Sequence, residues 1–174
     1  FLDLDIIVRR LFIPRREVAR SNPNTHLISI EVDPGVLVYG HLHLVGRDSP
    51  ILLFFHGNGE LAADYDPLSS LFTQLGVSLL VMDYRGYGIS DGSPSTTNMF
   101  RDAMSIFDAL PVSLAQYGCE PERVYVMGRS LGSAAALAVA DGRGHRIAGL
   151  IIDSGFAYTR PWLVRIGLAL DQFD

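Results

Sequence analysis

The chain has 174 residues, of which 48% are hydrophobic and 19% charged, so we expect one globular domain with a sizeable core. Its formal net charge of −5 argues against nucleic-acid binding, because neutralising phosphates requires a basic surface. The single cysteine, Cys119, excludes a disulfide within the chain, and no Cys/His cluster has zinc-ligand spacing. We therefore expect no metal and no other cofactor. No apolar run reaches the ~18–20 residues that span a bilayer.

Residues 1–25 precede the first predicted strand and are interpreted as an N-terminal extension. Between Ile6 and Arg16 this segment mixes apolar and basic residues. Such a segment most often packs an apolar stripe on its own domain and leaves its arginines in solvent, and this is the prediction here. The alternative, contact with an anionic membrane surface, stays open. A cytoplasmic location is favoured, and the alternative, if an upstream segment has been removed, is a membrane-associated one.

Two β-rich runs, His26 to Val32 and Val36 to Val45, flank Asp33-Pro34-Gly35 and predict an antiparallel hairpin. From residue 51 onward, short apolar runs alternate with helical patterns. The apolar runs cover residues 51–55, 77–82, 124–127 and 147–152, and the helical patterns cover residues 61–75, 96–110 and 133–140.

Wholly apolar strands that alternate with helices indicate a parallel sheet covered on both faces. The predicted fold is therefore α/β, with a mostly parallel sheet, helices on both faces and an antiparallel N-terminal hairpin. We assign residues 1–174 to one domain. In such a sheet, ligands bind at the carboxyl ends of the strands.

The pentapeptide Gly128-Arg129-Ser130-Leu131-Gly132 lies between a predicted strand and a helix of small residues. A sharp turn from strand to helix presents a serine at its apex, and its strained backbone requires glycine on both sides. The start of the helix also directs N–H groups at the serine, which favours negative charge there. Ser130 is therefore the candidate nucleophile.

The run His56-Gly57-Asn58-Gly59-Glu60 follows the strand at 51–55. Two glycines allow this loop to turn and expose backbone N–H groups, and acyl transfer needs two such donors aimed at the oxyanion. The N–H groups of Asn58 and Leu131 are the candidates. The alternative is an ordinary glycine-rich turn, and His56 is expected to brace this loop.

Two acidic residues also follow predicted strands. Asp83 and Arg85 are expected to form local hydrogen bonds or an ion pair that holds their loop beside the nucleophile elbow, the sharp turn at Gly128 to Gly132. Asp153 is a minor candidate for the acid that orients a catalytic histidine, although bonds to nearby backbone N–H groups are favoured.

Four blocks together resemble the α/β-hydrolase superfamily in order and spacing. They are His56 to Gly59, Asp83 to Ser90, Gly128 to Gly132 and Leu150 to Ser154. The serine-aminopeptidase and monoglyceride-lipase-like branch is the most similar. The resemblance implies a Ser-His-Asp/Glu triad with Ser130, an oxyanion hole at Asn58 and Leu131, and ester, thioester or amide substrates. It also implies that residues 157–174 begin a lid.

The sequence departs from that pattern after the fourth strand. The family order is serine, acid, histidine, and no histidine follows His145, which is expected at the opposite edge of the sheet. The C-terminal part of the pattern is thus absent, which gives an incomplete α/β-hydrolase fold. Three explanations stay open: the sequence is part of a longer polypeptide, which is favoured; a second chain supplies the histidine; or a truncated homologue binds without catalysing.

The predicted function is therefore that of a serine hydrolase that acts on a small acyl substrate through an acyl-enzyme at Ser130. The alternative is a catalytically inactive hydrolase-fold protein that binds or scaffolds. Neither the substrate nor the oligomeric state follows from the sequence.

Overall fold

One mixed sheet of six strands organises the protein, with the order β1-β2-β4-β3-β5-β6. The structure, a computed structural model, describes residues 2–17, 25–156, 158–165 and 167. The strands are β1 (His26–Asp33), β2 (Val36–His43), β3 (Ile51–Phe55), β4 (Ser78–Met82), β5 (Val124–Arg129) and β6 (Gly149–Asp153). Strands β1 and β2 form the predicted hairpin, β2 pairs antiparallel with β4, and the remaining pairs are parallel. The predicted fold class is confirmed.

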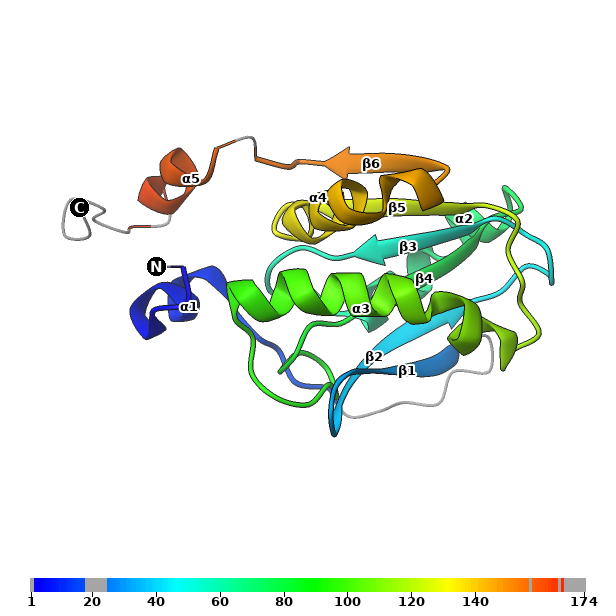
Figure 1. Ribbon diagram of the computed structural model, residues 1–174, viewed down its shortest axis with the longest axis horizontal. Coiled ribbons are helices and arrows are strands. Elements are labelled where there is room, and N and C mark those ends of the chain that lie inside the picture. The colour runs from blue at the N-terminus through cyan, green and yellow to red at the C-terminus, as the bar shows by residue number, and fades with distance from the viewer. Residues whose placement is uncertain (1, 18–24, 157, 166, 168–174) are drawn as a thin grey trace.

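Helices cover both faces of the sheet. The helices α3 (Thr96–Ala115) and α4 (Gly132–Arg143) pack against one face, and the 3-10 helix η1 (Ala62–Leu68) with the short α2 (Ser70–Thr73) packs against the other (Figure 1). Successive side chains of β3 point to opposite faces of the sheet, because side chains alternate along a strand. Leu53 and Phe55 join the core under α3 and α4, whereas Leu52 and Phe54 join the core under η1.

The prediction of one amphipathic helix over residues 61–75 is wrong. Pro67 lies inside this segment and has no N–H to donate, and the backbone follows a 3-10 helix before a single turn of α-helix. The leucines at helical spacing in this segment are not all buried, since Leu68, Leu71 and Leu75 are 45%, 62% and 80% exposed.

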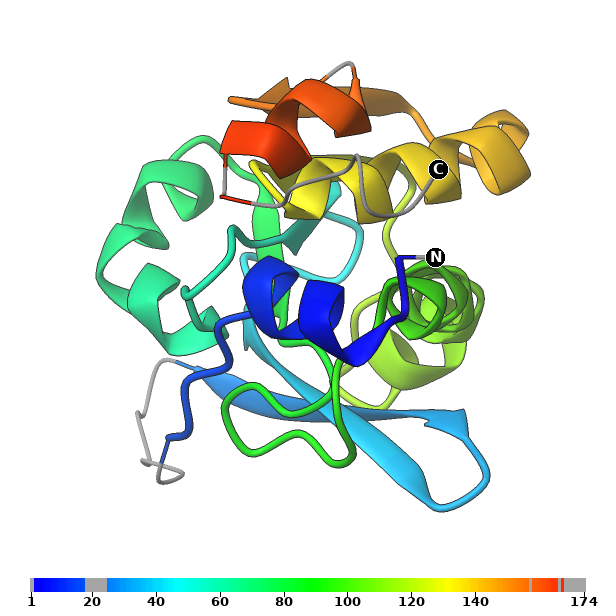
Figure 2. The ribbon, with the colours of Figure 1, turned by 90° about the vertical axis from the view of Figure 1, so that its left-hand side faces the viewer.

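The N-terminal helix α1 (Asp5–Leu11) packs on the carboxyl edge of the sheet (Figure 2). Ile7 and Leu11 are buried, whereas Arg9 and Arg10 are exposed, as the packed interpretation predicts. The Asp3 carboxylate accepts hydrogen bonds from the N–H groups of Thr96 and Thr97 and thereby ties α1 to the start of α3. No helix in the described part of the chain is long and apolar enough to cross a membrane.

The C-terminal end adds one outer strand and a short helix. Strand β6 lies at the edge of the sheet, and its apolar side chains Leu150, Ile151 and Ile152 are between 37% and 46% exposed. Helix α5 (Thr159–Arg165) follows, and residues 166 and 168–174 of the expected lid region lie outside the described residues. The assignment of residues 157–174 to a lid stays a prediction.

Candidate active site

Ser130 occupies the sharp turn between β5 and α4. Its φ is +50°, a left-handed conformation that non-glycine residues rarely adopt. A Cβ atom on Gly128 would lie 2.3 Å from the carbonyl oxygen of Gly132, and one on Gly132 would lie 2.0 Å from that of Phe55. Both positions therefore require glycine, because the turn brings α4 against the ends of β3 and β5.

The Ser130 backbone is fixed while its side chain stays available. Its N–H donates to the carbonyl oxygen of Asp153 at 2.9 Å, so the end of β6 supports the turn. The residue is partly exposed, and its hydroxyl has no hydrogen-bond partner among the described residues. A positive-φ serine with an uncommitted hydroxyl at the carboxyl edge of a parallel sheet suits a nucleophile.

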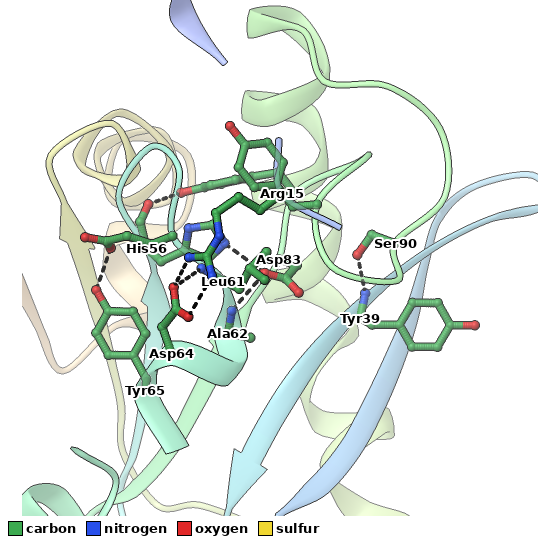
Figure 3. Close-up of polar contacts among 12 residues, drawn as sticks. Arg15, Tyr39, His56, Leu61, Ala62, Asp64, Tyr65, Asp83 and Ser90 are labelled. Atoms are coloured by element: carbon green, nitrogen blue, oxygen red, sulfur yellow. Dashed lines mark hydrogen bonds and ion pairs between the residues drawn. The ribbon is translucent and has the colours of Figure 1, made fainter. Parts of the chain in front are cut away.

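The loop after β3 is held from beneath by a buried histidine. The ring nitrogens of His56 lie 3.0 Å from Asp83 Oδ1 and 2.8 Å from the carbonyl oxygen of Gly57. Asp83 Oδ1 also accepts from the N–H of Ala62 at 2.9 Å, so one carboxylate connects both ends of the loop (Figure 3). His56 is fully buried, which agrees with its expected role in bracing the loop.

Asn58 lies in this loop, and its side-chain oxygen already accepts two hydrogen bonds. Asn58 Oδ1 accepts hydrogen bonds from the backbone N–H of Ile13 and the hydroxyl of Tyr87, both at 2.8 Å. Burial raises the pKa of Tyr87 further above neutrality, where the tyrosine hydroxyl is already protonated. The backbone N–H groups of Asn58 and Leu131 have no acceptor among the described residues. An oxyanion could therefore accept hydrogen bonds from both.

An ion pair that the sequence did not indicate links this loop to the elbow. Glu60 accepts hydrogen bonds from the N–H of Gly57 at 2.7 Å, the hydroxyl of Tyr65 at 2.6 Å and the guanidinium of Arg129 at 2.7 Å. Burial, and then the hydrogen bond to Glu60, raise the pKa of Tyr65 to about 12. Glu60 and Arg129 stand 69 positions apart, so spacing gives no signal for the pair.

Comparison with known proteins decides the family. The family model described as serine aminopeptidase, S33, matches residues 47–170. The chain belongs to this family of α/β hydrolases.

The chain also resembles individual proteins over parts of their length. It is 32% identical over 108 residues to protein bem46 of Schizosaccharomyces pombe, a match that covers 62% of the chain and 35% of bem46. It is 38% identical over 94 residues to the lysophosphatidylserine lipase ABHD12 of Gallus gallus, which covers 53% of the chain and 23% of that lipase. The chain thus spans about a quarter to a third of these two relatives.

Solved structures support the same fold. The Pyrococcus furiosus esterase Pf2001 superposes with a TM-score of 0.64 at 21% identity, over 83% of this chain and 58% of the esterase. A soluble variant of monoglyceride lipase from Saccharomyces cerevisiae gives a TM-score of 0.63 at 18% identity, over 83% and 49% of the two chains. The predicted resemblance to the α/β hydrolases is confirmed.

The acidic residues near the elbow of this hydrolase chain are engaged by structural partners. Of the expected local hydrogen bonds or ion pair, Arg85 forms an ion pair, but with distant partners: it forms a buried bidentate pair with Asp102 and also approaches Asp33. Asp153 lies 3.3 Å from the Arg129 guanidinium and accepts from the Ser154 hydroxyl at 2.9 Å. These contacts support structural roles for Asp83 and Asp153.

None of the described residues offers Ser130 a histidine. His41 and His43 both pair with Asp66 on the η1 side of the sheet, and His26 packs against the ring of Tyr117. His145 lies in a short 3-10 helix, η2 (Gly144–Arg146), before β6 and hence at the amino edge.

One cavity lies away from the elbow. It measures about 570 Å³ and lies at the amino edge of the sheet, lined by Phe107 and Leu110 of α3 and by His145 and Ile147. Because the chemistry-bearing loops of this fold lie at the carboxyl edge, we place the site by these loops rather than by cavity size. In the described ranges, no group of three or more His, Cys, Asp or Glu side chains could hold a metal ion.

Proposed function

We propose that Ser130 is the nucleophile of a serine hydrolase that cleaves carboxylic ester, thioester or amide bonds through an acyl-enzyme. The observation that carries this proposal is the positive φ of Ser130 at a turn where two glycines are sterically required. Membership of the S33 family supports it, and so do relatives whose own names are lipase or esterase.

The proposed reaction uses the backbone of two loops. The Ser130 oxygen attacks the substrate carbonyl carbon, and its proton passes to a histidine outside residues 1–174. The carbonyl oxygen becomes an oxyanion that accepts hydrogen bonds from the N–H groups of Asn58 and Leu131, and each such donor is worth about 10²–10³-fold in rate. Collapse expels the leaving group, which takes the proton, and water then releases the acid from the acyl-enzyme.

A catalytically inactive binding protein is the second candidate. It is favoured by the one observation that Ser130 has no histidine partner among the described residues. Without a base, a serine hydroxyl is a weak nucleophile at neutral pH. The two candidates make opposite predictions for the reactivity of Ser130 in the complete polypeptide.

The test is active-site labelling of the complete polypeptide. A fluorophosphonate should label Ser130, as located by mass spectrometry, and p-nitrophenyl esters should be hydrolysed. Ser130→Ala should abolish labelling and lower turnover by about 10⁴-fold or more. Ser154→Ala is a matched control, because Ser154 is the other described non-glycine residue with positive φ, and it should keep both activities. Labelling that persists in Ser130→Ala would contradict the assignment, and an unreactive wild type would favour the binding protein.

A further inference from the structure

A small apolar cavity lies beside the elbow, between α1, the start of α3 and the start of α4. Its volume is about 70 Å³. Four lining side chains, Leu11, Phe12, Met99 and Leu131, are 3–5% exposed and form a packed inner wall. Phe100, which also lines the cavity, is 37% exposed, so the cavity has a side that reaches solvent.

The lining of this cavity suits an uncharged occupant. No charged side chain lines it within the described ranges. Its one polar side chain is Thr96, whose hydroxyl donates to the carbonyl oxygen of Leu2 at 3.4 Å. A charged group placed there would lose its hydration without gaining a partner, which is strongly unfavourable. An alkyl chain would instead gain the usual free energy of apolar burial.

The cavity is lined by the residue of one proposed oxyanion donor and is connected to the other through Ile13. Leu131 lines it and carries one of the two N–H groups. Phe12 lines it from the other side, and the next residue, Ile13, donates its N–H to the side chain of Asn58. A substrate whose carbonyl oxygen lies between the Asn58 and Leu131 amides would therefore begin its acyl chain next to this opening.

The N-terminal wall is held in place by several polar contacts. Arg15 donates to Asp64 Oδ2 at 2.5 Å and to the carbonyl oxygen of Gly59 at 3.1 Å (Figure 3). The N–H of Gly88 donates to the carbonyl oxygen of Arg15 at 2.8 Å. Residues 2–13 are thus anchored at their start by Asp3 and just beyond their end by Arg15, as a stable binding surface requires.

We infer that this cavity is the subsite for the substrate's acyl chain, that it takes a short uncharged chain, and that residues 2–13 form one of its walls. The inference rests on the proposed hydrolase function and adds a substrate class to it. It favours esters of short fatty acids over substrates with a charged acyl group. It also gives the N-terminal segment a part in specificity.

The test compares kcat/KM of the complete polypeptide for p-nitrophenyl acetate, butyrate and hemisuccinate. Burial of a methylene group corresponds to about fourfold, so the two extra methylenes of butyrate should raise kcat/KM about 15-fold over acetate. The hemisuccinate, whose chain ends in a carboxylate, should be at least ~100-fold slower than butyrate. Ala134→Leu fills the cavity and should bring the butyrate-to-acetate ratio close to one.

Ala138→Leu is the matched control, because Ala138 lies one turn further along α4, is half-buried like Ala134 and does not line the cavity. It should keep the wild-type ratio. An unchanged ratio in Ala134→Leu, or an equal fall in Ala138→Leu, would overturn the subsite. If Ala134→Leu does not fold, Phe100→Ala replaces it, and this variant should raise octanoate turnover relative to butyrate; an unchanged ratio again overturns the subsite.

The two proposals fail in different ways. A wild type that hydrolyses acetate with no preference for butyrate overturns the subsite and leaves the hydrolase proposal standing. A wild type that hydrolyses no ester and does not react with a fluorophosphonate overturns the hydrolase proposal, and the subsite with it.

Discussion

Arg85 and Asp102 form a buried ion pair that fixes the loop after β4 on helix α3. Arg85 Nε and Nη2 each lie 2.7 Å from an oxygen of Asp102, and the two side chains are 8% and 7% exposed. Removing one partner of a buried pair leaves an uncompensated charge and costs about 3–5 kcal/mol. Asp33, 3.4 Å from Arg85 and 38% exposed, offers partial compensation. We therefore expect Asp102→Asn to lower the free energy of unfolding by about 3 kcal/mol, the lower end of that range.

Urea denaturation of the complete polypeptide, followed by circular dichroism, measures this loss. Asp33→Asn is the control, because it removes the more exposed partner of Arg85 and should cost less than about 1 kcal/mol. The double variant Arg85→Met/Asp102→Leu should recover most of the loss, because it leaves no buried charge behind. Equal losses in Asp102→Asn and in the double variant would show that the stability does not depend on an orphaned charge, and would refute the reasoning.

Two further predictions concern other charged contacts. The hydrogen bond from Arg143, and then that from Arg146, lower the pKa of Asp108 to about 2 from an ordinary 3.8. The stabilisation of the folded state by the Asp108 carboxylate is therefore complete above pH 3.8 and is lost as the pH falls towards the pKa of about 2 in the folded protein. In urea titrations, the difference in free energy of unfolding between wild type and Asp108→Asn should shrink over this pH range. A difference that stays constant with pH would contradict the prediction. Glu60→Gln breaks the link to Arg129 and should lower kcat about tenfold with little change in KM, because loop position matters most in the transition state. The melting temperature of Glu60→Gln should change little, since a partly exposed ion pair is worth ~0–1 kcal/mol. A change in KM without a change in kcat would contradict the role of this pair in positioning the loop.

The sequence predicted the parts of this fold that depend on local pattern. Wholly apolar runs at β3 and β4 indicated buried parallel strands, because only a sheet covered on both faces buries every side chain. The glycines at positions 128 and 132 indicated a sharp turn, and the structure gives the steric reason for both. Even the hairpin turn at Gly35, with φ of +72°, follows from local chemistry.

Contacts between distant segments could not be predicted in this way. The bond from Ile13 to Asn58 joins residues 45 positions apart, and nothing in either segment alone indicates the other. The helix expected over residues 61–75 failed for a related reason. Its leucines have helical spacing, but Pro67 and the packing of Tyr65 against Phe54 decide the local backbone. Hydrophobic periodicity indicates which side chains would share one face of a helix, but it does not show whether other elements of the fold cover that face.

The acids around the elbow are engaged by structural partners. Glu60 is engaged by Gly57, Tyr65 and Arg129, and Asp83 by His56 and Ala62. A Cβ on Gly88 would lie 2.2 Å from Asp83 Oδ2, so the second oxygen of this carboxylate packs directly on the backbone. Each acid here holds one loop against another element, and both ring nitrogens of His56, the histidine that pairs with Asp83, already have partners in Asp83 and Gly57. In the proposed reaction, these contacts would hold the loops that carry Ser130 and the amides of Asn58 and Leu131, and proton transfer would fall to another residue.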